Sequence, residues 1–339
     1  MSLAETTLSY HMFLNRSAII IGETNSGKTT IILDILYQLK PFVDQIVVFS
    51  KTDSQTHTYS GGMVPSVLVH NRITPELLKD IYDRQANLAS VYDKVWRPEV
   101  IRGLFSRIIN SSNKTLIQTT IDRIRATIAE LSTSEEEESK FIVMVCERYI
   151  KVIYRAIFNN NAAHLMNAGG LTKDERFSLQ YIDLNPNLVL LFDDMTSDLG
   201  AIKNDPTLLD FFNQCRHIKT SMIMSIHSDK FLLPNHKKAA FVNIFARESS
   251  ANAYMNRDTS DLDREAKAKF KLSAKRAFTE SNKWQKLMFL TGSGEYYRFT
   301  ATKQDYFEFC SPTVRRFCEE VKAEPGTLSR QNKFSYAFR

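Results

Sequence analysis

Residues 17–30 read Ser-Ala-Ile-Ile-Ile-Gly-Glu-Thr-Asn-Ser-Gly-Lys-Thr-Thr and join a short apolar strand to a glycine-rich turn. From Gly22 to Thr29 the stretch fits the phosphate-binding pattern G-x-x-x-x-G-K-[ST]. Its glycines let the backbone curl so that successive N–H groups face phosphate oxygens. The helix that follows adds the positive end of its dipole. The expected nucleotide contacts are Gly22, Glu23, Thr24, Asn25, Ser26, Gly27, Lys28, Thr29 and Thr30.

Within this loop two side chains have expected roles toward a nucleotide and its metal. Lys28 is expected to act in catalysis by reaching the β- and γ-phosphates of ATP, and the Thr29 hydroxyl is expected to bind Mg²⁺. The pattern alone occurs by chance, but here it lies between an apolar strand and a helical stretch. The sequence therefore predicts ATP and Mg²⁺ as cofactors.

The elements around the loop indicate an α/β fold. A helix is expected over Lys28–Lys40 and ends at Pro41, and an apolar run at Ile46–Phe49 follows it. A strand, a helix and a strand in about 35 residues form a βαβ unit, which is typical of a parallel sheet. Further expected strands are Leu188–Phe192, Ser221–Ile226 and Phe241–Phe245, and the runs Lys286–Leu290 and Tyr296–Thr300 predict a hairpin.

Two carboxylates, Asp193 and Asp194, follow the apolar run Leu188–Phe192 directly. We expect Asp193 to hold the magnesium ion through water and Asp194 to orient and deprotonate the attacking water. The alternative is a solvated Asp-Asp turn that closes the strand.

His227 follows another buried run, Ser221–Ile226. In P-loop ATPases with an extra sheet strand, a polar residue at such a position senses the γ-phosphate. A histidine there can donate a hydrogen bond to the phosphate or to the attacking water. We therefore assign His227 the sensor role, with a purely structural histidine as the alternative.

The middle of the chain has a different pattern. Apolar residues recur at helical spacing from Ile117 to Leu131 and from Ile142 to Ile157, which predicts a helical insertion. The expected segments are 1–84 for the P-loop half of the ATPase core, 85–180 for the insertion, 181–300 for the half with the two aspartates and the sensor, and 301–339 for a C-terminal tail.

Composition excludes several classes of protein. The chain has 339 residues, of which 43% are hydrophobic and 24% are charged, so a disordered tail, a collagen-like fibre and a disulfide miniprotein are excluded. No apolar run approaches the roughly 18 residues that span a bilayer, and the first residues lack a secretory signal. Four cysteines without a CxxC pair indicate reduced thiols in a cytoplasm-like compartment.

A basic run from Arg264 to Lys286 holds eight basic and two acidic residues, within a chain of net charge +6. Phe270, Phe278 and Trp284 are interleaved with the basic residues. One interpretation is binding to a phosphate backbone. The other is a solvated basic helix, and the sequence leaves both open.

Several blocks of the chain resemble a known family. They are Ile19–Leu36, Val47–Ser50, the strand that ends in Asp193-Asp194, the run Leu208-Leu209-Asp210-Phe211-Phe212, and Cys215-Arg216-His217-Ile218-Lys219-Thr220-Ser221 ahead of the sensor strand. These blocks are similar to the poxvirus-type genome-packaging ATPases of nucleocytoplasmic large DNA viruses, within the FtsK/HerA superfamily of P-loop NTPases.

The resemblance implies a three-layer α/β P-loop NTPase sandwich with a mainly parallel central sheet, a helical insertion and a C-terminal hairpin and tail. It implies an ATPase motor that translocates double-stranded DNA into a viral capsid, as a ring of five or six identical subunits. Virion capsid or membrane proteins are further expected partners, and the host cytoplasm, at viral assembly sites, and the virion are the expected locations. Arg216 is expected to complete a neighbouring subunit's site, with Arg247 and Lys238 behind it.

The chain departs from the family pattern at three places. His227 stands where the family usually has glutamine, Lys237-Lys238 stands where an arginine is expected, and residues 85–165 are longer and more helical. Two other functions therefore stay open: a P-loop nucleoside or nucleotide kinase, and a nucleotide-binding assembly factor that does not hydrolyse ATP.

Overall fold

A computed structural model describes residues 3–108, 111–134, 136–167, 169–257, 262–278 and 284–323. The chain divides into two compact units, Met1–Asn87 with Pro186–Arg339, and Leu88–Asn185. We call these the sheet unit and the helical unit. Helix α3 (Pro75–Val95) begins in the sheet unit and ends in the helical unit. The four functional segments expected from the sequence remain a proposal.

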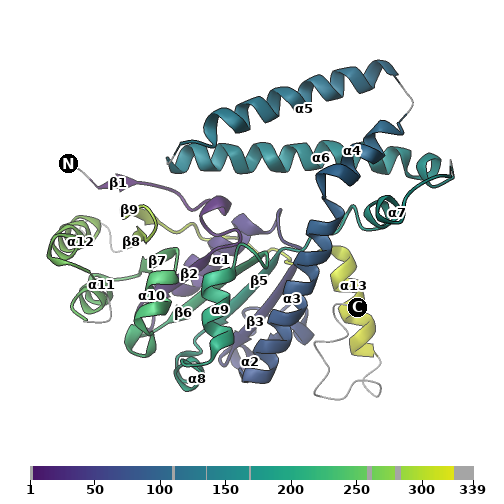
Figure 1. Ribbon diagram of the computed structural model, residues 1–339. Coiled ribbons are helices and arrows are strands. Elements are labelled where there is room, and N and C mark those ends of the chain that lie inside the picture. The colour runs from purple at the N-terminus through teal and green to yellow at the C-terminus, as the bar shows by residue number, and fades with distance from the viewer. Residues whose placement is uncertain are drawn as a thin grey trace. The chain divides into compact units, whose positions relative to one another are not determined.

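The described part of the sheet unit is built on one sheet of nine strands in the order β1-β9-β8-β7-β2-β6-β5-β3-β4 (Figure 1). Strands β2 to β7 pair in parallel, while β8 is antiparallel to both β7 and β9. The strands are β1 (Ala4–Glu5), β2 (Ser17–Ile21), β3 (Gln45–Ser50), β4 (Val69–His70), β5 (Leu188–Asp193), β6 (Thr220–Ile226), β7 (Val242–Phe245), β8 (Gln285–Leu290) and β9 (Glu295–Thr300).

Helices cover both faces of this sheet, because its central strands are apolar on both sides. Ile19 and Ile21 of β2 belong to one core, while Ala18 and Ile20 belong to the other. Helices α3, α9, α11 and α12 contribute to the first core, and α1 and α13 contribute to the second. The three-layer α/β prediction is therefore confirmed.

The helices of the sheet unit, apart from α3, are short to medium in length. They are α1 (Lys28–Leu39), α2 (Asp53–Thr56), α8 (Thr196–Ala201), α9 (Pro206–Gln214), α10 (Pro234–Ala239), α11 (Glu248–Met255), α12 (Arg264–Ala277) and α13 (Pro312–Ala323), with 3₁₀ turns at Tyr10–Met12, Ser66–Leu68 and Asp229–Phe231. The predicted hairpin is confirmed as β8 and β9, and it extends the main sheet through β7. Phe307 and Phe309 of the tail are buried in the second core.

The basic run from Arg264 to Lys286 is only partly a surface feature. Its helix α12 buries Phe270 completely, against the rings of Phe245, Tyr254 and Tyr296. This aromatic residue therefore belongs to the core and is not available to stack on a base. Lys283 lies outside the described residues.

The helical unit contains α4 (Pro98–Ser106), α5 (Ser111–Leu131), α6 (Glu137–Asn167) and α7 (Lys173–Gln180). Helices α5 and α6 contain the two periodic runs that the sequence predicts as helical. A separate core that includes Leu104, Ile121 and Phe158 joins the helices. Within the described ranges, no helix has the length and apolar character that crossing a membrane requires.

Candidate nucleotide site

The backbone of the glycine-rich loop is shaped by its two glycines. Gly27 has φ +89° at the N-cap of α1, a left-handed conformation that favours glycine. A Cβ atom at Gly22 would lie 2.5 Å from Ser26 Oγ and 2.6 Å from Ala246 Cβ. Position 22 therefore has no room for a side chain, because Ser26 of the same loop and Ala246, which follows β7, lie against it. Of its other residues, Glu23, Thr24, Asn25 and Thr29 are exposed and Thr30 is half-buried.

Strand β6 lies between β2, which leads into this loop, and β5, which leads into Asp193 and Asp194. Ile21 pairs with Ile226, and the Gly22 N–H donates to the Ile226 carbonyl at 3.1 Å. The carboxyl ends of three parallel strands thus meet at one edge of the sheet. This arrangement brings the loop, the two aspartates and His227 together.

Lys28, His227 and Asp194 form a continuous hydrogen-bonded chain. Lys28 Nζ lies 3.2 Å from His227 Nδ1, and His227 Nε2 lies 2.6 Å from Asp194 Oδ1. An ammonium group can only donate, so Nδ1 accepts and the proton is on Nε2, which donates to the carboxylate. The geometry therefore fits a neutral His227 that links the cation to Asp194.

Lys28 is also held by the loop itself. Its Nζ donates to the carbonyls of Gly22 at 2.8 Å and Glu23 at 3.0 Å. Burial lowers the pKa of Lys28, while the nearby charges of Asp193 and Asp194 oppose that shift. These carbonyls keep the ammonium group at the mouth of the loop, within reach of a phosphate.

Asp193 has a partner that the sequence analysis missed. The Tyr59 hydroxyl, which is completely buried, donates to Asp193 Oδ2 at 2.8 Å. Burial raises the pKa of Asp193, and the hydrogen bond from Tyr59 opposes that shift. Asp53 fixes Tyr59 in turn, since its Oδ1 accepts from the Tyr59 N–H at 2.6 Å. Tyr59 thus fixes the orientation of the Asp193 carboxylate at the end of β5.

Lys286 holds the glycine-rich loop in place, a role that the sequence did not predict. Its side chain is buried, and Nζ donates to the carbonyls of Ser26 at 2.9 Å and Ala246 at 3.1 Å. Burial lowers the pKa of Lys286, and the charge of Arg247 adds to that shift. Lys286 therefore braces the loop from β8, and it does not belong to a surface that could bind a phosphate backbone.

The three cations expected to complete a neighbouring subunit's site, Arg216, Arg247 and Lys238, lie at different places. Arg247 is near the loop, where its guanidinium pairs with Glu23 at 3.1 Å. Lys237 is buried and pairs with Asp229 at 2.6 Å, whereas Lys238 is exposed on α10.

Arg216 lies ahead of β6, at the end opposite to His227. The seven residues of β6 span roughly 23 Å at about 3.3 Å per residue. The Arg216 guanidinium is exposed and lies 6.0 Å from the ring of Phe241. Arg216 is therefore too far away to act on the nucleotide site of its own chain.

A cavity of about 410 Å³ opens at the shared edge of the strands. Its lining includes the loop from Thr24 to Thr29, both aspartates and His227. Thr52, which follows β3, and Trp284, which precedes β8, complete it. The volume lies within the range of about 300–1,000 Å³ that small-molecule sites usually have. Glycines at the close approaches, a lysine at the mouth and two carboxylates in the lining fit a nucleotide with a metal ion.

The brace from Lys286 leads to a prediction. Lys286→Met keeps the length of the side chain but leaves the Ser26 and Ala246 carbonyls without their donor. Each lost partner costs about 1–3 kcal/mol, so we expect ATP affinity to fall by about tenfold or more. Calorimetric titration with ATP, combined with thermal melting, measures the effect.

A matched control is Lys271→Met, which removes an exposed lysine from α12. We expect the control to bind ATP as the unchanged protein does. Equal ATP affinity for a folded Lys286→Met variant would mean that the brace does not shape the loop.

No family model matches the chain. Protein B354L of African swine fever virus is 25% identical over 362 residues in one isolate, covering 99% of this chain and 96% of the relative, and 25% identical over 357 residues in another.

Solved structures that are similar include the genome packaging NTPase B204 from Sulfolobus turreted icosahedral virus 2, in complex with sulfate. It is 12% identical, with a TM-score of 0.36, over 87% of this chain and 99% of that one. The pCW3 conjugation coupling protein TcpA is 11% identical, with a TM-score of 0.42, over 92% of this chain and 66% of that one. The chain's own sheet order shows its α/β fold, and the proteins it is similar to are viral proteins, a genome-packaging NTPase among them, and a conjugation coupling protein.

Proposed function

We propose that the chain is an ATP hydrolase that drives double-stranded DNA into a viral capsid. One observation carries the hydrolase part of this proposal: Lys28, His227 and Asp194 form one hydrogen-bonded chain at the carboxyl ends of β2, β6 and β5. A phosphate-binding cation is thus linked to a carboxylate that can act as a base. Transfer to an acceptor, as in a kinase, does not need such a link.

Each residue has a separate task in this proposal. Lys28 exchanges the carbonyls of Gly22 and Glu23 for phosphate oxygens, and the loop N–H groups hold the rest of the phosphate chain. Thr29 and Asp193 hold Mg²⁺, with Tyr59 fixing the orientation of Asp193. When bound, the metal ion neutralises charge that develops on the phosphates.

Asp194 takes the proton of the attacking water, and His227 holds its carboxylate in place. His227 also reports on the phosphate. When a phosphate draws Lys28 away from His227, Nδ1 loses its hydrogen-bond donor. The imidazole ring can then form a hydrogen bond with another group in its place. A histidine can occupy the position where the family usually has glutamine, because Nδ1 contacts Lys28, the phosphate-binding cation, and Nε2 contacts Asp194, the proposed base.

The DNA-binding part of the proposal rests on sequence resemblance and charge. Lys269, Lys271 and Lys275 lie exposed on α12, where they can meet backbone phosphates without sequence preference. We infer a ring of five or six subunits, capsid or membrane proteins of the virion as further partners, and a location at viral assembly sites in the host cytoplasm and in the virion.

Two substitutions separate ATP binding from hydrolysis. Asp194→Asn retains Asp193 and Thr29 for the metal, so we expect ATP binding to persist and phosphate release to fall by about 10²-fold or more. Lys28→Ala removes the cation from the phosphate cradle, so we expect both binding and turnover to be lost. Calorimetric titration with ATP and a phosphate-release assay measure the two properties on each variant.

If Asp194→Asn lost ATP binding while still folded, the metal-holding and base roles of the two aspartates would be assigned the wrong way round.

Arg216 is proposed to complete the site of a neighbouring subunit, since it lies far from its own. An arginine supplied in trans can raise hydrolysis by about 10³-fold or more. Arg216→Ala and Asp194→Asn chains should each be nearly inactive, and mixed assemblies of the two should regain phosphate release. Some interfaces in a mixed ring then have both groups intact.

Arg247→Ala mixed with Asp194→Asn is the matched control, because Arg247 lies at the site of its own chain. We expect this mixture to release no more phosphate than its Arg247→Ala chains release on their own, since Arg247 contacts only the loop of its own chain in this proposal. No regain from Arg216→Ala in rings shown to have mixed would contradict the trans role.

A further inference from the structure

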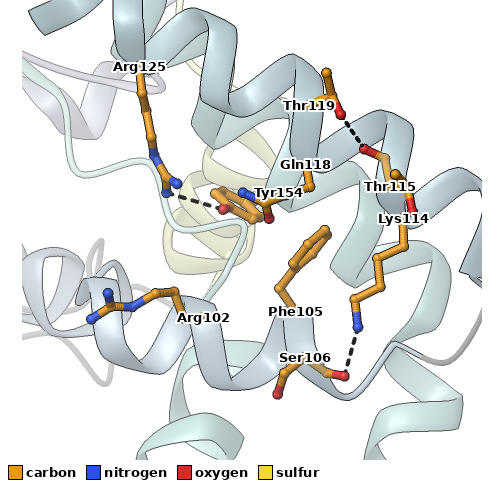
Figure 2. Close-up of a pocket in the computed structure, with 9 residues that line it drawn as sticks. All are labelled: Arg102, Phe105, Ser106, Lys114, Thr115, Gln118, Thr119, Arg125 and Tyr154. Atoms are coloured by element: carbon orange, nitrogen blue, oxygen red, sulfur yellow. Dashed lines mark hydrogen bonds between the residues drawn. The ribbon is translucent and has the colours of Figure 1, made fainter.

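The helical unit has a cavity of its own, separate in the chain from the residues of the nucleotide site. It has a volume of about 480 Å³ and is lined by residues of α4, α5 and α6 (Figure 2). Three of its lining residues are the cations Arg102, Lys114 and Arg125, and no acidic residue is among them. The proposed ATPase mechanism makes no use of this cavity.

Lys114 is placed for a ligand by contacts with the end of α4. Its Nζ donates to the carbonyls of Ser106 at 2.9 Å and Ile108 at 3.1 Å. An ammonium group has three donors, so one N–H remains after these two bonds. The two carbonyls hold the charge in place before any ligand arrives, as Figure 2 shows for Ser106.

Arg125 reaches the cavity from α5 and is oriented by Tyr154 of α6, whose hydroxyl lies 3.4 Å from Nη2 (Figure 2). Arg125 pairs with the carboxylate of Asp122 at 3.4 Å, and Asp122 also accepts from Gln118 at 2.8 Å. Asp122 does not line the cavity. The five donors of a guanidinium exceed these contacts, which leaves donors for an anion.

Phe105 and Tyr154 form an apolar side of the cavity. Both side chains are buried, and their rings meet edge to face at 5.7 Å between centroids. An apolar wall lowers the local dielectric constant, which strengthens the attraction between the cations and an anion. It also offers contact area to the uncharged part of a ligand.

We propose that this cavity binds a phosphate monoester of mononucleotide size, either free or at the 5′ end of a DNA strand. A guanidinium group or an ammonium group matches an anion with several oxygens and more than one charge. Figure 2 shows Arg102 and Lys114 on opposite sides of Phe105, so the cavity offers cations at more than one place along its lining. A volume of about 480 Å³ suits a small ligand and is too small to take in a duplex from its side.

The test uses the full-length chain with Lys28→Ala, which weakens phosphate binding at the glycine-rich loop. The probes are deoxyadenosine monophosphate, a single-stranded oligonucleotide with a 5′-phosphate, and each of these without its phosphate. Calorimetric titration measures affinity, and hydrogen exchange of backbone amides locates the binding. We expect a phosphate-dependent slowing of exchange in α4 and the first half of α5.

Arg102→Gln with Arg125→Gln removes two cations from the cavity, and we expect affinity for the phosphate-bearing probe to fall about tenfold or more. The matched control is Arg123→Gln with Arg176→Gln, which removes the same charge from exposed positions outside the cavity. The control should bind as the parent does. If the first pair fails to fold, Arg102→Gln alone, at an exposed position on α4, serves in its place.

The probes distinguish the two sources of phosphate. Binding of the monophosphate points to a free nucleotide, and binding of the phosphorylated oligonucleotide alone points to a strand end; either result supports the proposal. Equal binding of probes with and without phosphate would overturn it. Equal loss in the cavity pair and in the control pair would overturn it too, as would protection confined to the glycine-rich loop.

Discussion

The position of β6 between β2 and β5 is the constraint on which the nucleotide site depends. Backbone pairing sets Ile21 opposite Ile226 and Asp193 opposite Ser225. His227 therefore emerges between the glycine-rich loop and the aspartate pair, within bonding distance of Lys28 and Asp194. Because side chains alternate along a strand, a slip of one residue would turn each of these groups to the other face of the sheet.

The two lysines at this edge of the sheet, Lys28 and Lys286, are held by backbone carbonyls. Lys28 and Lys286 each donate to two backbone carbonyls of the loop region and not to a carboxylate. An ammonium group held by carbonyls is easier to redirect to a phosphate than one in a close ion pair with a buried aspartate. Asp193 is restrained by Tyr59 instead. Lys28 and Asp193 thus have different hydrogen-bond partners within the one site.

Local sequence patterns predicted the loop, the aspartate pair and all the strands except the two-residue strands β1 and β4, because each of these features depends on neighbours in the chain. Residues far apart in sequence were beyond such patterns. Tyr59 meets Asp193 across 134 positions and Lys286 meets Ser26 across 260, and neither has a local signal. Phe270 was weighed with the basic surface because its neighbours are lysines, yet helical spacing turns its ring into the core. The antiparallel addition of the hairpin to β7 was likewise not visible from spacing.

The central claim is that the linked Lys28, His227 and Asp194 serve a DNA-driven ATP hydrolase. The most direct measurement is the rate of phosphate release from ATP by the full-length chain, with and without double-stranded DNA. The account predicts release in the absence of any acceptor molecule and a higher rate when DNA of any sequence is added. ATP binding without phosphate release, in the presence and in the absence of DNA, would contradict it.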